Sequence, residues 1–302
     1  MNKKILIIGV VAVIIVAAIG AAVVLGNDGS KERTTVTEQG SDTMLELMTI
    51  LAEDFHDSQG SVQVDVTGGG SGVGIEALTQ GHIDVAQASR SIKASEMAAA
   101  QQNGVTPVEF AVAIDGIAII VNQGNTVGSL TIEQLRGIYN GTYTNWNQVG
   151  GADMPISAFG RQSTSGTYDF VKEAVMEKGD FAPSVSPETG NAAITVKVQQ
   201  TAGGIGYVGI GYAKQATSAK IVPLAEESGG ASFLPTDETA VYNKSYPLSR
   251  SLFLYTDGTP SDAVKQWMEY VLSDEGQNTV AQEGFYKLDP ATLQTMRDRL
   301  SA

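Results

Sequence analysis

The sequence predicts an α/β fold with two lobes and a ligand cleft between them, preceded by an N-terminal hydrophobic helix. Two observations lead to the lobes: short apolar strands alternate with helical patterns from Thr35 onward, and roughly 270 residues exceed what one small core usually holds. Ligands of such folds bind between the lobes, at the carboxyl ends of strands. The helix is predicted by an uncharged apolar run at the start of the chain.

Residues 1–26 are predicted to be a signal peptide or a membrane anchor. Lys3 and Lys4 precede the uncharged stretch from Ile5 to Leu25, which as a helix rising about 1.5 Å per residue covers roughly 30 Å, the thickness of a bilayer's hydrocarbon core. The lysines are expected to stay cytoplasmic, so the rest of the chain lies outside. The length of the run favours an anchor over a cleaved signal. Residues 27–34 are polar and form a predicted tether.

The alternation of strands and helices is read from short runs of apolar residues separated by helical periodicity. Predicted strands cover residues 35–38, 61–66, 83–86, 108–113, 117–121, 156–159, 206–208 and 252–255. Predicted helices cover residues 43–55, 74–78, 132–139, 168–177 and 262–271.

The composition is that of an acidic globular protein. The chain has 302 residues, with 19 Lys or Arg against 33 Asp or Glu and a formal net charge of -14. A non-specific nucleic-acid binder needs an excess of cationic side chains to release phosphate counterions, so no nucleic-acid partner is expected. The chain has no cysteine, which excludes disulfides, thiolate metal sites and cysteine nucleophiles.

Three clusters of glycine and hydroxyl residues each follow a predicted strand and precede a helix. They are Gly40 to Thr43, Gly68 to Gly72, and Ser163 to Thr167. Helix N-terminal N–H groups beside hydroxyl donors suit a small oxyanion, and Arg161 adds a fork of charged donors. Each cluster alone is also explained by an ordinary helix cap with a glycine turn. Three clusters and one arginine together favour anion binding.

Enzyme motifs are largely missing from the sequence. There is no P-loop and no Gly-x-Ser-x-Gly elbow, and His56 and His82 are the only histidines. A hydrolase needs a nucleophile, a base and an orienting group, and a zinc site needs more nitrogen or sulfur ligands than two histidines supply. We therefore expect no catalytic residues, no metal and no cofactor.

Several short strings stand in a recognisable order along the chain. They cover residues 40–44, 69–75, 84–90, 115–118, 130–135, 144–146, 161–167, 204–208 and 246–250. In this order they resemble the phosphate-binding subunit of the phosphate-specific ABC importer, a family of periplasmic-type solute-binding proteins. The resemblance implies capture of inorganic phosphate outside the cytoplasm and delivery to permease subunits driven by a cytoplasmic ATPase, by a monomer without enzymatic activity. Binding of sulfate, molybdate or tungstate, a sensing role, and a phosphate-ester hydrolase on the same scaffold are the alternatives.

The resemblance also implies where the lobes and the ligand lie. A periplasmic-binding-protein-like fold assigns residues 35–114 and 247–302 to a discontinuous lobe I and residues 115–246 to lobe II. Lobe I is expected to contribute ligand residues from the first two clusters together with Ser89, and lobe II from Arg161 and the third cluster. The expected phosphate ligands are Ser41, Asp42, Thr43, Gly70, Ser71, Ser89, Arg161, Ser165, Gly166 and Thr167.

One departure from the family pattern concerns the proton of the bound phosphate. Some members place an aspartate, which accepts that proton, where this chain has Ser89. Asp42 and Asp115 are the two candidates to replace it. Asp42 is equally suited to capping a helix, and Asp115 is also explained as a solvated or hinge carboxylate.

Overall fold

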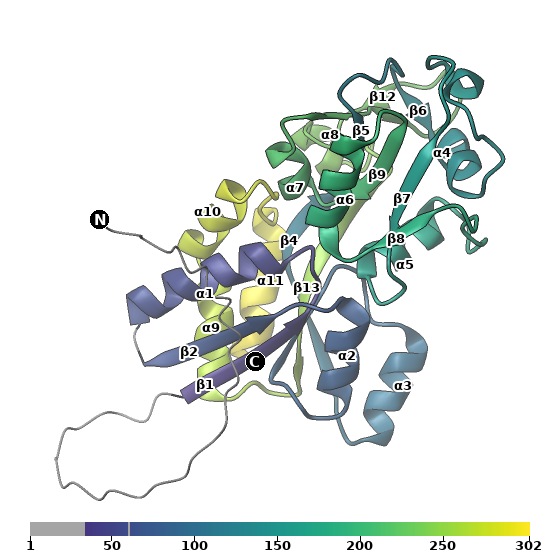
Figure 1. Cartoon of the computed structure of the whole chain (residues 1–302). Helices are drawn as coiled ribbons and strands as arrows, with labels where there is room; N and C mark the ends of the chain where they lie inside the picture. The colour runs from purple at the N-terminus through teal and green to yellow at the C-terminus, as the bar shows by residue number, and fades with distance from the viewer. Residues whose placement is uncertain (1–33, 60) are drawn as a thin grey trace, which may run out of the picture. The chain divides into compact units, whose positions relative to one another are not determined.

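Two five-stranded sheets and one small three-stranded sheet form the framework of the fold (Figure 1). The computed structural model describes residues 34–59 and 61–302. The predicted signal or anchor at 1–26, and all of the predicted tether except Thr34, lie outside the described residues. Within the described ranges, no helix combines the length and the apolar character needed to cross a membrane.

The first sheet has the strand order β2-β1-β3-β13-β4, the second β10-β5-β9-β7-β8, and the third β12-β11-β6. The strands are β1 (Thr34–Gly40), β2 (Val62–Thr67), β3 (Val85–Ala88), β4 (Pro107–Gly116), β5 (Ala118–Asn122), β6 (Leu130–Thr131), β7 (Ser157–Arg161), β8 (Ser186–Glu188), β9 (Gly204–Val208), β10 (Ala219–Ile221), β11 (Leu224–Ala225), β12 (Ser232–Phe233) and β13 (Ser249–Asp257). The helices are α1 (Leu45–Gln59), α2 (Ser71–Thr79), α3 (Ala94–Gln102), α4 (Ile132–Tyr139), α5 (Gly166–Ala174), α6 (Gly190–Gln200), α7 (Ile210–Gln215), α8 (Glu238–Tyr242), α9 (Asp262–Val271), α10 (Asp274–Gln282) and α11 (Pro290–Ser301), with a 3₁₀ turn at Trp146–Val149.

The first sheet is mixed and is covered by helices on both faces. Strand β1 runs parallel to β2 and β3, whereas β13 runs antiparallel to β3 and β4. Neighbouring side chains of a strand point to opposite faces. Accordingly, Val85 of β3 joins the core that includes α1 and α9, while Ala86 packs with Ile75 and Leu78 of α2.

The second sheet is packed against α6. Strands β7, β8 and β9 are parallel, and β5 is antiparallel to both β9 and β10. The α6 side chains Ile194 and Val198 are fully buried, and the absence of a side chain at Gly206 in β9 leaves room for both. The β-branched residues of α6 give it modest helix propensity, so the helix was not predicted from the sequence. Its packing on β9 stabilises it instead.

Two connections join the sheets. The chain passes from β4 to β5 at Ile117, and it returns after α8 through residues 243–248 into β13. The two connections touch, because the N–H of Ile117 donates to the carbonyl of Leu248 at 2.9 Å. The described residues belong to one compact unit, so the assignment of residues 35–114 with 247–302 and of 115–246 to separate lobes stays a prediction.

The predicted elements agree best where the periodicity is strong. The predicted helices at 132–139 and 262–271 are confirmed as α4 and α9. The predicted strand at 83–86 is displaced, since β3 begins at Val85 after the turn near Gly81. Helices α3, α6, α7, α8, α10 and α11 were not predicted.

Candidate anion-binding site

The three predicted clusters meet at one point of the molecule. They follow β1, β2 and β7, and they lead into α1, α2 and α5. The N–H of Gly70 donates to the carbonyl of Gly40 at 2.8 Å, and the N–H of Gly72 donates to the carbonyl of Thr164 at 3.1 Å. The structure therefore brings the three clusters together, with two coming from the first sheet and one from the second.

Four hydroxyl groups from these turns and from the end of β3 form two close pairs. The Oγ1 atoms of Thr43 and Thr167 lie 2.9 Å apart, which joins the two sheets, and the Oγ atoms of Ser71 and Ser89 lie 3.2 Å apart. All four residues are at most 1% exposed. Gly166 must lack a side chain, because a Cβ there would collide with the Ser71 hydroxyl.

The hydroxyl oxygens in this region accept hydrogen bonds from backbone N–H groups. Ser71 Oγ accepts from the N–H of Ser89 at 3.0 Å, and Ser41 Oγ accepts from that of Thr43 at 3.2 Å. Ser165 caps α5 by accepting from the N–H of Thr167 at 3.2 Å. A hydroxyl has one proton, which stays available for donation when its oxygen accepts. These hydroxyls are therefore arranged as donors.

Arg161, the last residue of β7, pairs with Asp42 after β1. Its Nη2 lies 2.6 Å from Asp42 Oδ2, and the residue is only 2% exposed. Among the described residues, Nε and Nη1 of this guanidinium have no hydrogen-bond partner although both are buried. Burial lowers the pKa of Arg161 from its ordinary value, and the Asp42 carboxylate opposes that shift.

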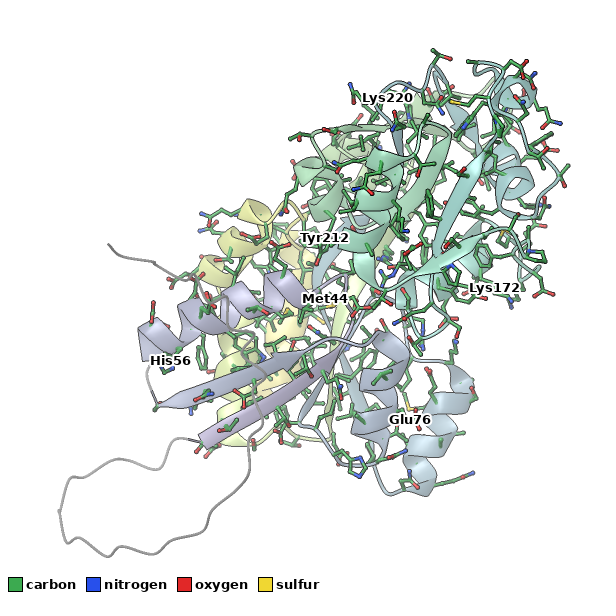
Figure 2. The ribbon with its side chains drawn as sticks, viewed as in Figure 1. Met44, His56, Glu76, Lys172, Tyr212 and Lys220 are labelled. Atoms are coloured by element: carbon green, nitrogen blue, oxygen red, sulfur yellow. The ribbon has the colours of Figure 1, made fainter. Side chains whose placement is uncertain are left out.

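Asp42 is fixed from several sides. Its Oδ1 accepts from the N–H of Gly69 at 2.8 Å, and its backbone carbonyl accepts from Asn191 Nδ2 and from the Tyr212 hydroxyl, each at 3.3 Å. Figure 2 labels Tyr212 on α7 and Met44 at the entry to α1, the two segments that this contact joins. Each carboxylate oxygen of Asp42 has one partner, so each keeps a lone pair for a further donor.

Sequence reasoning missed a second buried arginine in this region, Arg250 of β13. Arg250 lies directly opposite Asp115 of β4, and its Nε and Nη2 donate to Asp115 Oδ2 at 3.0 and 2.8 Å. Asp115 Oδ1 accepts the N–H of Ile210 at 3.0 Å. The string 246–250 contained this arginine, but its place in the site depends on the β4–β13 register, which has no local sequence signal.

The charges of this region cancel in pairs. Arg161 pairs with the partly buried Asp42 and Arg250 pairs with the buried Asp115, and the N-terminus of α5 adds partial positive charge through its free N–H groups. The surplus hydrogen-bonding capacity is on the donor side: two guanidinium N–H groups and a set of hydroxyls. Such an arrangement suits a ligand rich in acceptors, such as a small oxyanion.

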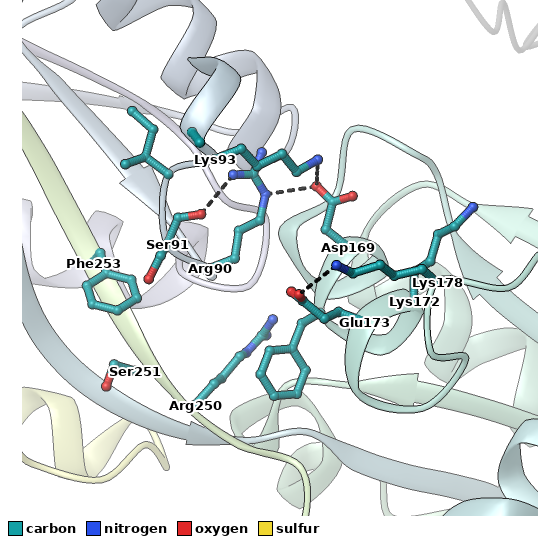
Figure 3. Close-up of a pocket in the computed structure, with 13 residues that line it drawn as sticks. Arg90, Ser91, Lys93, Asp169, Lys172, Glu173, Lys178, Arg250, Ser251 and Phe253 are labelled. Carbon is teal, nitrogen blue, oxygen red and sulfur yellow. Dashed lines mark hydrogen bonds and ion pairs between the residues drawn. The ribbon is translucent and has the colours of Figure 1, made fainter. Parts of the chain in front are cut away.

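A cavity of about 820 Å³ is lined by Arg250, but by none of the ten expected phosphate ligands (Figure 3). At its rim, Asp169 of α5 accepts from Arg90 Nε at 2.8 Å and lies 2.7 Å from Lys93 Nζ, so an ion-pair cluster joins the loop after β3 to a helix of the second-sheet region. Arg90 also pairs with Glu96 at 2.7 Å. Within the part of the chain that the structure describes, no three metal-ligating side chains cluster closely enough to hold a metal ion.

Comparison with known proteins gives a consistent result. A family model described as a PBP superfamily domain matches residues 26–275. The phosphate-binding protein PstS of Pseudomonas aeruginosa is 35% identical over 297 residues, covering 93% of this chain and 91% of the relative. The protein of the same name from Staphylococcus epidermidis is 33% identical over 288 residues, covering 90% and 87%.

Solved structures agree with these relatives. A putative phosphate ABC transporter substrate-binding protein from Clostridium perfringens, with bound phosphate, superposes with a TM-score of 0.75 at 29% identity, covering 85% of this chain and all of the other. An ABC-type phosphate transport receptor from Vibrio cholerae gives a TM-score of 0.68 at 30% identity, covering 84% of this chain and 100% of the other.

Proposed function

The chain belongs to the PBP superfamily and, within it, to the PstS phosphate-binding proteins, and from that premise we propose that it binds inorganic phosphate for an ABC phosphate importer. The observation that carries the proposal is the pair of buried, unpartnered N–H groups on Arg161, which lies across from Asp42. Two charged donor nitrogens without a partner in the described part of the protein suit the acceptor oxygens of a tetrahedral oxyanion.

In this proposal the ten residues predicted from sequence form the ligand shell. Arg161 supplies charge, Ser71 and one hydroxyl of the Thr43–Thr167 pair donate protons, and the N-terminus of α5 adds backbone donors. Hydrogen bonds to a charged group contribute about 1.5 to 3 kcal/mol each, so a half-dozen reach micromolar affinity, about -8 kcal/mol, after ordering costs. The remaining members are Ser41, Asp42, Gly70, Ser89, Ser165 and Gly166.

Asp42, rather than Asp115, is proposed to accept the hydrogen bond that the proton of the bound phosphate donates. Each oxygen of Asp42 has one partner, whereas Asp115 Oδ2 accepts twice from Arg250 and Oδ1 accepts from Ile210. Asp42 therefore keeps lone pairs near the unpartnered nitrogens of Arg161. A carboxylate acceptor favours an anion that carries a proton and disfavours sulfate, which would leave two acceptors facing each other.

Ligand capture is proposed to close two lobes, residues 35–114 with 247–302 and residues 115–246. This division is supported by the make-up of the site, because Thr43 and Asp42 follow a first-sheet strand while Thr167 and Arg161 come from the second-sheet region. The hinge would be the two connections that meet at Ile117 and Leu248. Closure excludes water from the bound ion.

The partners are proposed to be permease subunits with a cytoplasmic ATPase, approached by a monomer on the extracytoplasmic face of the cell membrane. The apolar stretch from Ile5 to Leu25 would anchor the chain there or direct its export. Fractionation of cells expressing the full chain tests this: recovery in the membrane or exported fraction supports it, and recovery in the cytosol contradicts it.

The proposed role is binding without catalysis. The relatives are named as binding proteins, and the residues converging on Arg161 are donors and capping groups rather than a nucleophile with a base. Incubation with p-nitrophenyl phosphate tests this role, since steady release of nitrophenol by the purified chain, lost in an Arg161→Met variant, would contradict it.

The decisive experiment for the ligand is calorimetric titration of the full chain, freed of bound anion by partial unfolding and refolding. Phosphate is expected to bind with micromolar or tighter affinity, and sulfate to give no binding heat at the same concentrations. Equal binding of both anions would show that the site binds tetrahedral oxyanions in general rather than phosphate. If neither anion binds, the chain has the fold of the family without its binding function.

A further inference from the structure

Arg250 contacts residues on both sides of the proposed phosphate site. Its Nη2 lies 2.9 Å from Thr167 Oγ1 and 3.4 Å from Thr43 Oγ1, and its Nη1 donates to the carbonyl of Ser89 at 2.9 Å. Thr43 and Ser89 follow first-sheet strands, and Thr167 lies on α5 after a second-sheet strand. One side chain thus contacts three of the ten expected ligand residues.

The chemistry of the guanidinium decides how those hydroxyls point. Arginine has five N–H donors and no acceptor, so Thr167 Oγ1 must accept from Arg250 and direct its own proton elsewhere. Thr43 Oγ1 lies 2.9 Å from Thr167 Oγ1, so one of the two hydroxyl protons is used between them and the other is left for an anion. Without the guanidinium, either hydroxyl can turn its oxygen lone pairs toward an anion, which is repulsive.

Arg250 is itself held rigidly, which suits a positioning role. Asp115 binds it through Nε and Nη2, and its guanidinium carbon lies 5.6 Å from the centre of the Phe170 ring. The residue is 7% exposed. Figure 3 shows Arg250 at the edge of the cavity, reaching from β13 toward the neighbouring loops. In contrast to Arg161, its nitrogens already have partners in the protein.

We infer that Arg250 is a positioning residue for phosphate binding: it holds the hydrogen-bonded pair of Thr43 and Thr167 hydroxyls, one from each side of the site, so that the one proton not used within the pair points toward the anion. This inference rests on the proposed phosphate function. It assigns to Arg250 no direct contact with phosphate. It also explains why the β13 strand, which supplies none of the expected ligands, runs next to the site.

The test is a double-mutant cycle measured by phosphate calorimetry on the full chain, using Arg250→Lys and Thr167→Val. Lysine keeps the charge but has one ammonium, which cannot serve both Ser89 and the threonines. Valine keeps the threonine shape without the hydroxyl. Arg250→Lys is expected to weaken phosphate binding by about 10- to 100-fold in the native background, and by only about 3-fold when Thr167 is already valine.

A purely structural role for Arg250 gives a different result. It lowers the thermal unfolding midpoint and weakens phosphate binding by the same factor in both backgrounds, which would overturn the inference. An unchanged affinity in Arg250→Lys would overturn it as well. Arg136→Lys is the matched control, because Arg136 binds the Val175 carbonyl and Glu177 away from this region, and it is expected to leave the affinity unchanged.

The design stays decisive if Arg250→Lys does not fold. The double variant Asp115→Asn/Arg250→Gln removes both charges together, which avoids leaving a buried charge unpaired, and the same cycle with Thr167→Val is then measured on it. A lack of phosphate binding by the unmodified chain is the separate outcome that rejects the proposed function and, with it, the inference.

Discussion

The two arginine–aspartate pairs differ in where they lie and in which arginine N–H groups they leave without a partner. Arg161 and Asp42 pair across the two sheets, and two N–H groups of Arg161 have no partner among the described residues. Arg250 and Asp115 pair between neighbouring strands of the first sheet, and the arginine's Nε, Nη1 and Nη2 all have partners.

The two arginines therefore have different roles, although both are simply arginines in the sequence. Arg161 keeps donors without a partner among the described residues and can bind a further acceptor. The nitrogens of Arg250 all have partners, so this residue fixes the geometry of the groups around it. Burial lowers the pKa of both arginines, and the partner carboxylate opposes the shift in each. The two pairs thus differ in hydrogen-bond saturation rather than in electrostatics.

The largest expected effect is on Arg161. Arg161→Met removes the charge and both unused donors, so phosphate affinity is expected to fall by about 1000-fold, from two charged hydrogen bonds of roughly 2 kcal/mol each. Calorimetry on the full chain measures it, with Arg136→Met as the control that keeps native affinity. A loss smaller than the loss caused by Arg250→Lys would reverse the roles assigned to the two pairs.

Glu38 of β1 is a buried carboxylate that, unlike Asp42 and Asp115, has no cationic partner among the described residues. It is 1% exposed and accepts only from Trp267 Nε1, at 2.7 Å, among the described side chains. Burial raises its pKa from 4.5 to about 8, and the hydrogen bond from Trp267 partly opposes this. The folded protein therefore holds the proton that the unfolded chain releases.

Stability should consequently fall as the pH rises from about 4.5 to about 8, by a few kcal/mol in the free energy of unfolding, and then level off. Glu38→Gln carries no titrating proton and should remove this decline. Urea unfolding of both proteins at pH values across this range, followed by circular dichroism, tests it. Parallel pH profiles would show that Glu38 does not titrate in the range.

Asp42→Asn removes the carboxylate of the Arg161–Asp42 ion pair. The variant leaves Arg161 without a neutralising charge and takes away the carboxylate acceptor, so sulfate should gain relative to phosphate. We expect the sulfate-to-phosphate affinity ratio to rise by about 10- to 100-fold. Competition calorimetry measures the ratio. If it stays constant, Asp42 acts as a capping and pairing residue, and the ligand's proton is accepted elsewhere.

The smallest effect is expected at the rim, where Asp169 pairs with Arg90 and Lys93. Asp169→Asn weakens a partly exposed contact between the first-sheet loop and α5, at a cost of about 1 kcal/mol. Release of radiolabelled phosphate into excess unlabelled phosphate should become about 5-fold faster. The difference from the native chain should shrink at about 0.5 M salt, which screens exposed charges; a salt-independent difference would argue against an ionic contact.

The features predicted correctly from sequence have local signals. The three clusters were found because glycine and hydroxyl residues mark the turn between a strand and a helix, and α4 and α9 because of their apolar periodicity. The α/β class and the family resemblance are confirmed by the family match and by the relatives. The role of each ligand residue stays a prediction.

The features that were missed depend on contacts between distant segments. Arg250 meets Asp115 only through the register of β13 on β4, across 135 residues of sequence. Arg90 lies within a quoted string, yet its partner Asp169 is 79 residues away. Helix α6 was missed because its β-branched residues lower helix propensity, and packing on β9 outweighs that preference.

The most direct test of the account is a crystal structure of the full chain with phosphate. We expect an anion whose oxygens accept hydrogen bonds from Nε and Nη1 of Arg161 and from the Thr167 hydroxyl, while Arg250 stays bound to Asp115 and touches no phosphate oxygen. An anion held by Arg250 instead, or bound away from Arg161, would contradict the division of roles between the two pairs.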